Sequence, residues 1–195
     1  MTSTAKPRVL VFAGSAREAS LNKKLARVAA KAVNDLGGEA TFVDLRDFPM
    51  PIYEGDLEER EGMPPFARKL RELFVSHPAF LIVTPENNGT VPSLLKNAID
   101  WLSRDVDGRS GLEPYKGKVI GLMSASPGAF GGVVALTHLR HSLSKLLAHV
   151  VAEQFPLPHA DKAFAEDGAL HEAWQQKSVN AVVSRLLDTT TKLTA

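Results

Sequence analysis

Several side chains that can bind an anion stand close together near the start of the chain. Ser15, Arg17 and Ser20 follow Gly14 in a short polar segment, and Asn22 ends it. Serine hydroxyls and an asparagine amide donate hydrogen bonds, and arginine adds a fixed positive charge whose fork of N–H groups grips phosphate oxygens. These residue types predict a phosphate-binding loop, whose candidate contacts are Ser15, Arg17, Ser20, Leu21 and Asn22.

The sequence around this loop predicts a strand that leads into a helix. Residues 9–13 form an apolar run of strand length, and apolar residues recur at helical intervals from Leu21 to Leu36. The first turn of a helix presents unpaired N–H groups and the positive end of the macrodipole, which suits an anion. A purely structural role is the alternative, with Ser20 only as an N-cap and Gly14 only as a turn residue.

The size of the anion follows from what the loop lacks. It has neither the three-glycine dinucleotide motif nor the Gly-Lys-Ser/Thr ending of a nucleoside-triphosphate loop. A monophosphate held by hydroxyls, amides and one arginine fits these residues better than a pyrophosphate or a triphosphate.

Length and composition limit the class of protein. With 195 residues and 21.1 kDa, the chain is most economically one domain, 1–195, with 1–7 as a polar lead that we expect to be flexible. A net charge of +1 gives no bulk attraction to nucleic acid or membrane. The absence of cysteine excludes disulfides, thiol nucleophiles and thiolate metal sites. Since no apolar signal segment follows the lead, we expect a cytoplasmic protein.

Strand-like and helix-like segments alternate along the rest of the chain. We expect strands at 40–44, 79–84, 119–124 and 149–155, and helices at about 64–74, 93–102, 133–147 and 169–187. The proline-rich and acidic segment 48–61 is expected to be a long surface loop. This alternation predicts an α/β fold with a parallel sheet covered by helices on both faces.

Two further polar loops follow strands, at 85–92 and 124–132. Because the carboxyl ends of parallel strands meet at one edge of a sheet, these loops and the phosphate loop are expected to form one site. Their convergence is a stronger argument than any one loop alone.

The three loops, taken in order, resemble those of the NADPH-dependent FMN reductase family. The first is similar to the family pattern Gly-Ser-x-Arg-x-x-Ser-x-Asn, and 126–132 is similar to its third loop. The second resembles Pro-Glu-Tyr-Asn-Gly-Ser-x-Pro followed by Leu-Lys-Asn-Ala-Ile-Asp-Trp, which 95–101 matches. The resemblance extends over about 8–151.

The resemblance implies a flavodoxin-like three-layer sandwich with a five-stranded parallel sheet of order 2-1-3-4-5. It implies FMN as cofactor, NADPH or NADH as donor, and a quinone, flavin, azo compound or metal oxyanion as acceptor. It also implies a homodimer or homotetramer and no catalytic side chain or metal, because the flavin carries the redox step. Beyond the first loop, the implied cofactor contacts are Pro85, Glu86, Asn87, Asn88, Gly89, Thr90, Ser124, Ser126, Gly128 and Gly131.

Two positions depart from the family pattern. Asn87 stands where the family usually has tyrosine, and Thr90 where it usually has serine. Thr90 keeps the hydroxyl, but Asn87 removes an aromatic ring from beside the expected flavin. Since backbone N–H groups around 88–90 are expected to hold the pyrimidine edge, we expect Asn87 to change affinity and substrate preference rather than ligand class.

Alternatives remain for the protein and for single residues. A flavodoxin-type electron carrier would use the same phosphate loop, although a charge of +1 does not suit a charged docking face. A flavin-free binding or regulatory protein is the third possibility. Glu86 is expected to contribute a loop contact rather than act as a general acid, and His138 and His141 lack further ligands for a metal. The apolar face with Ala98, Trp101 and Leu102 belongs either to the core or to a dimer contact.

Overall fold

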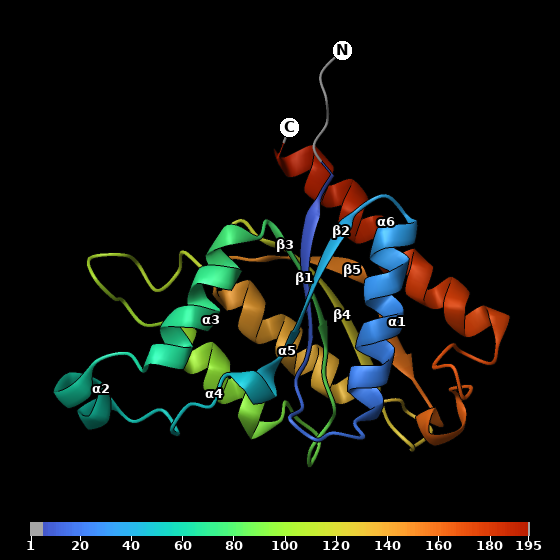
Figure 1. The fold of residues 1–195 in the computed structure, drawn as a ribbon, viewed down its shortest axis with the longest axis horizontal. Coiled ribbons are helices and arrows are strands. Elements are labelled where there is room, and N and C mark those ends of the chain that lie inside the picture. The colour runs from blue at the N-terminus through green and yellow to red at the C-terminus, as the bar shows by residue number, and fades with distance from the viewer. Residues whose placement is uncertain (1–5, 195) are drawn as a thin grey trace.

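A computed structural model describes residues 6–194, so most of the expected polar lead 1–7 lies outside the described residues. Five parallel strands form one sheet in the order β2-β1-β3-β4-β5 (Figure 1). Their bounds are β1 Arg8–Ala13, β2 Glu39–Asp44, β3 Ala79–Val83, β4 Val119–Ala125 and β5 His149–Leu157. The predicted fold class and strand order are confirmed.

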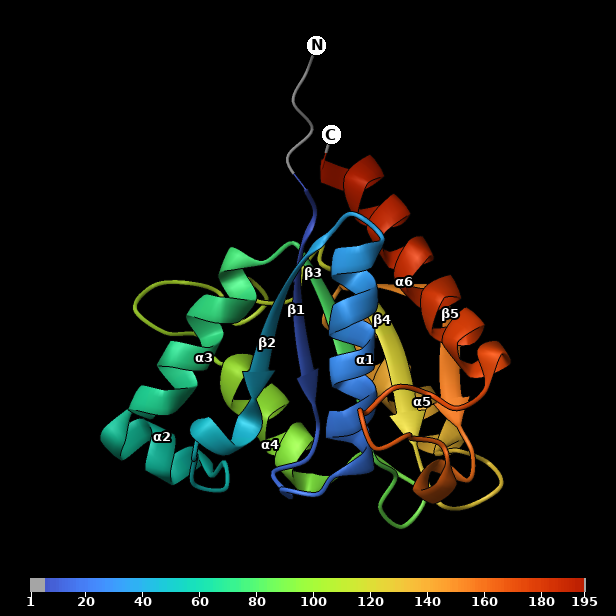
Figure 2. The same cartoon turned by 45° about the vertical axis from the view of Figure 1, so that its right-hand side comes forward.

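Helices cover both faces of this sheet (Figure 2). One face carries α1 (Leu21–Asp35) and α6 (Ala173–Thr194), and the other carries α3 (Pro65–Ser76), α4 (Ser93–Leu102) and α5 (Val133–Lys145). Short 3-10 turns follow β2 and β5 at Leu45–Asp47 and Ala160–Lys162. Among residues 6–194, no helix combines the length and apolar character that crossing a bilayer requires.

The uninterrupted apolar sequence of the central strands is explained by burial on both faces. In β1, Val9 and Val11 pack in the core shared with α1 and α6, whereas Leu10 and Phe12 pack in the core under α3, α4 and α5. Ala13 pairs with Val83, and Val83 with Met123. The three loops therefore leave the sheet side by side, at the lower edge in Figure 2.

The expected surface loop at 48–61 is wrong in its second half, where α2 (Gly55–Glu61) forms. Glu54 caps this helix, because its carboxylate oxygens accept the N–H groups of Asp56 at 2.8 Å and Leu57 at 2.9 Å. Glu58 also accepts hydrogen bonds from Tyr53 and Arg104. Local capping, the neighbouring Tyr53 and the long-range partner Arg104 thus order this charged segment.

Two other predicted helix bounds also differ from the structure. The helix expected to reach 147 ends at Lys145, and Leu147 takes a left-handed backbone with φ of 64°. The last helix begins at Ala173, not 169, because the N–H of Ala165 bonds the carbonyl of Ala169 and keeps that segment in a turn.

The apolar face of α4 is core within one chain. Trp101 and Leu102 are fully buried, and the indole N–H of Trp101 donates to the carbonyl of Pro51 at 2.8 Å. Tyr53 packs edge-on against the Trp101 ring with centroids 5.1 Å apart. The segment 51–53 covers this face, so it is not available as a dimer contact.

Buried His77 gives the fold a pH dependence. Its Nδ1 donates to the carbonyl of Leu73 at 2.7 Å, so the neutral ring accepts from the hydroxyl of Thr41 at Nε2, at 2.8 Å. Burial lowers the pKa of His77 below its ordinary 6.5. Below pH 6.5 the unfolded chain therefore binds the proton first, and stability falls by at most about 1.4 kcal/mol per pH unit until the folded pKa is passed.

We expect His77→Gln to remove this contribution. Urea unfolding of both proteins at pH 7.5 and 5.5 should show a smaller acid loss of stability in the variant. Equal losses in the two proteins would contradict the assignment.

Candidate functional site

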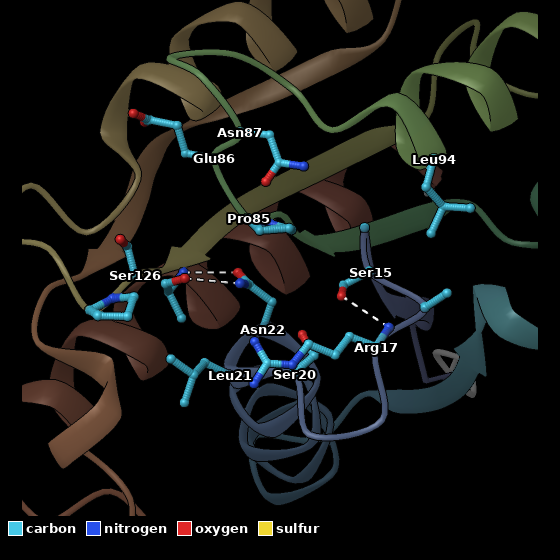
Figure 3. Close-up of a pocket in the computed structure, with 14 residues that line it drawn as sticks. Ser15, Arg17, Ser20, Leu21, Asn22, Pro85, Glu86, Asn87, Leu94 and Ser126 are labelled. Carbon is cyan, nitrogen blue, oxygen red and sulfur yellow. Dashed lines mark hydrogen bonds between the residues drawn. The ribbon is translucent and has the colours of Figure 1, made fainter.

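The three loops enclose one cleft of about 500 Å³ beyond the carboxyl ends of β1, β3 and β4 (Figure 3). From the phosphate loop it takes Ser15, Arg17, Ser20, Leu21 and Asn22, as predicted. From the other loops it takes Pro85, Glu86, Asn87 and Ser126. The volume lies within the range of small-molecule sites.

The phosphate loop begins at a glycine because nothing larger fits. A Cβ on Gly14 would lie 2.9 Å from Cδ2 of Leu95 and 3.1 Å from the hydroxyl of Thr84. The N–H of Gly14 also continues the sheet by bonding the carbonyl of Val83 at 2.9 Å. The loop is therefore held tightly against the start of α4.

Two hydroxyls and one arginine follow at the N-terminus of α1. Ser20 is the N-cap, and its hydroxyl oxygen accepts the N–H of Lys23 at 3.4 Å, which leaves its own proton free to donate. Ser15 accepts the N–H of Arg17 in the same way at 3.3 Å. The Arg17 side chain is exposed, and in Figure 3 it extends toward the first turn of α1. A donor set of this kind suits a phosphate.

A buried ion pair lies beneath this loop. Lys23 is 3% exposed, and its Nζ is 2.6 Å from Oδ2 of Asp44, at the end of β2. Burial acts to raise the pKa of Asp44, but the hydrogen bonds from Lys23 and from the N–H of Arg46 outweigh it and lower the pKa. The carboxylate thus stays ionised and neutralises the lysine charge inside the fold.

The side chain of Asn22 makes two hydrogen bonds within the protein. Its amide nitrogen donates to the carbonyl of Ala125 at 2.9 Å, and its amide oxygen accepts the N–H of Ala125 at 2.9 Å. The side chain is buried and joins α1 to the end of β4. Asn22 therefore holds the phosphate loop and the loop after β4 together.

The second loop is a tight hairpin. The N–H of Asn87 bonds the carbonyl of Thr90 at 3.0 Å, and the N–H of Thr90 bonds the carbonyl of Asn87 at 3.1 Å. Asn88 and Gly89 form the turn with φ of 51° and 72°, which Asn-Gly pairs adopt readily. The N–H of Thr90 is therefore already hydrogen-bonded within the hairpin. Among the described residues, the N–H groups of Asn88 and Gly89 have no protein partner.

The glycines of the third loop serve backbone packing. A Cβ on Gly131 would lie 2.7 Å from the backbone of Pro156, and one on Gly132 would lie 3.0 Å from Cβ of Ser124. Both have positive φ, and Ser124 donates its hydroxyl proton to the carbonyl of Gly131 at 2.6 Å. A side chain at either position would therefore meet protein atoms, whereas Gly128 is exposed.

Some predicted residues do not line the cleft, and some lining residues were missed. Asn88, Gly89, Thr90, Ser124, Gly128 and Gly131 lie outside it, with Ser124 fully buried. Gly14, Ala16, Leu94, Ala125 and Pro127 line it without having been named as contacts. Apolar and backbone contacts of this kind carry no motif; for Leu94, the signal was its place at the start of a helix that follows a site loop.

A second cavity of about 860 Å³ adjoins the cleft at Asn87, which lines both. Asn88, Thr90, His138 and His141 contribute to its wall. Nδ1 of His138 lies 3.0 Å from the hydroxyl of Thr90, so this histidine has a protein partner.

The donor set of the cleft fits FMN. Arg17, Ser20 and the first turn of α1 suit the phosphate, while Leu94, Ala125 and Pro127 supply apolar wall for a ring. Glu86 is the one carboxylate among the described lining residues, and its Oε2 is held by the N–H groups of Val134 at 3.0 Å and Ala135 at 3.1 Å. No free negative charge therefore opposes an anionic ligand.

Comparison with known proteins agrees with this reading of the cleft. The family model for NADPH-dependent FMN reductase matches residues 7–162. A quinone reductase of Escherichia coli is 36% identical over 149 residues, which are 75% of this chain and 74% of that protein. An NAD(P)H-dependent FMN reductase of Pseudomonas aeruginosa is 33% identical over 165 residues, or 84% of each chain. The structure of a flavoenzyme NAD(P)H:(acceptor) oxidoreductase from Paracoccus denitrificans superimposes with a TM-score of 0.79 at 28% identity, over 95% of this chain and 98% of that one.

Proposed function

The chain belongs to the NADPH-dependent FMN reductase family, and from that premise we propose that it passes electrons from NADPH or NADH through FMN to a quinone. When bound, FMN supplies the redox chemistry, since it takes a hydride equivalent from NAD(P)H and gives electrons to the acceptor. The observation that carries the proposal is the meeting of three loops, from β1, β3 and β4, around one cleft with a phosphate-type donor set. Relatives described as quinone reductases support the choice of acceptor.

The residues of the chain then have distinct tasks. Arg17, Ser20 and the free N–H groups at the start of α1 hold the phosphate. From the second loop, Pro85 and Asn87 line the cleft and are the residues that would contact the flavin ring. Asn87 separates the cleft from the second cavity, so its short side chain sets how far a donor or acceptor can extend between them.

We also propose that the protein works in the cytoplasm as a homodimer or homotetramer. Support for assembly comes from Phe130, which is 81% exposed on the third loop beside the cleft. A mass in solution near 21.1 kDa would contradict the assembly, and cell fractionation tests the location.

A visible spectrum tests the function directly. The purified protein with added FMN should show a bound-flavin spectrum that bleaches with anaerobic NADPH and returns on addition of a benzoquinone. A protein that takes up no FMN contradicts the proposal. Flavin uptake with slow steady-state NADPH oxidation would favour an electron carrier instead.

A further inference from the structure

Helix α5 takes its N-terminal cap from a distant part of the chain. Its N-cap residue is Gly132, which has no side chain and a φ of 87°. In place of a local cap, Oε2 of Glu86 accepts the N–H groups of Val134 and Ala135. A carboxylate at this position also meets the positive end of the helix dipole.

The same helix holds the second loop at another point, one turn further along. Nδ1 of His138 is 3.0 Å from the hydroxyl of Thr90, on the far side of the 87–90 hairpin from Glu86. The hairpin is closed by its own two backbone hydrogen bonds. Two contacts to one rigid helix thus fix both the position and the tilt of a rigid hairpin.

We propose that Glu86 is a positioning residue that docks the 85–92 loop onto α5 and so fixes where Pro85 and Asn87 stand in the wall of the flavin cleft. The inference rests on the proposed FMN function. Figure 3 shows the carboxylate of Glu86 directed away from Ser15 and Arg17, while the side chain of Asn87 lies nearer the cleft. Glu86 therefore fixes the position of the loop, and its negative charge is directed toward α5 and not toward the flavin ring.

The geometry separates this role from acid catalysis. The Glu86 oxygen that makes hydrogen bonds accepts two N–H groups, and both come from the helix backbone. A general acid needs its proton within hydrogen-bond reach of the reacting atoms. This carboxylate is turned to the helix instead, so its effect reaches the ring through the loop.

The test compares FMN with riboflavin, which share the ring and differ by the phosphate. We expect Glu86→Ala to weaken both ligands by the same factor, about tenfold, since hydrogen bonds to charged groups contribute on that scale. Glu86→Gln keeps an acceptor oxygen and should recover most of the loss. Dissociation constants from flavin fluorescence quenching give both numbers on the folded protein.

Glu54→Ala is the matched control, because Glu54 also caps a helix through two N–H groups but lies outside the cleft. It should lower stability and leave both dissociation constants unchanged. Unchanged binding in Glu86→Ala, or an equal loss in Glu54→Ala, would overturn the proposal. A loss for FMN alone would overturn it too, since that places Glu86 at the phosphate.

A second variant covers the case in which Glu86→Ala does not fold. His138→Leu removes the other contact and should weaken riboflavin and FMN by equal factors; wild-type affinity there would overturn the docking role. Failure of the wild-type protein to bind either flavin is a different result, because it contradicts the proposed function itself.

Discussion

Replacing Arg17 and Ser20 together by alanine should weaken FMN binding by about 100-fold or more and change riboflavin binding by less than about threefold. Only FMN carries the phosphate dianion, and each charge-assisted hydrogen bond to it contributes about 1.5–3 kcal/mol. Loss of about 2.7 kcal/mol corresponds to that 100-fold change. The exposed Arg17 side chain has no ion-pair partner among residues 6–194, so little in the protein competes for it.

Two contributions must be separated in this experiment. Ser20 also caps α1, and its loss should cost about 1 kcal/mol of stability without ligand. Unfolding without flavin measures this cost, while titration of folded protein with each ligand measures the site. An equal loss for riboflavin and FMN would refute the placement of the phosphate.

Arg27→Ala controls for charge at a distance. Arg27 lies on the same helix, stacks over the Phe42 ring and does not line the cleft. The variant removes the same formal charge as Arg17→Ala. If Arg27→Ala lowered FMN affinity as much as Arg17→Ala, the long-range effect of positive charge on this helix would explain the binding, and not direct contact with Arg17.

The sheet and the three loops could be predicted because their evidence is local. A strand buried on both faces reads as an apolar run, and the polar residues that follow it mark the loop. Strand order came from the resemblance, and convergence of the loops followed from parallel topology. Each of these steps needs only the residues of one segment, the family resemblance, or the general rule that ligands bind at the carboxyl ends of parallel strands.

What could not be predicted depends on pairs far apart in sequence. Asn22 bonds Ala125 across 103 residues, and Glu86 bonds Val134 across 48. The motifs single out both residues, but a motif does not say whether a side chain faces the ligand or another loop. The same limit applies to Gly131, whose small size is required by the backbone of Pro156 on β5.

The second large effect is expected at Asn22, through stability. Asn22→Ala leaves the N–H and the carbonyl of Ala125 without their partners at a position that is 4% exposed. An unsatisfied buried polar group costs about 1–3 kcal/mol, so the two together should lower the free energy of unfolding by roughly 2–5 kcal/mol. Urea unfolding without flavin should show a lower midpoint at an unchanged slope.

Asn34→Ala is the matched control, because Asn34 lies at the other end of α1 and makes one exposed hydrogen bond, to the N–H of Ala40 at 2.9 Å. It should cost about 1 kcal/mol or less. Asn22→Ala should also weaken FMN and riboflavin binding by similar factors, because the hydrogen bonds between Asn22 and Ala125 set the spacing between the phosphate loop and the loop after β4. If the two variants lost equal stability, the hydrogen bonds between Asn22 and Ala125 would not be what holds these loops together.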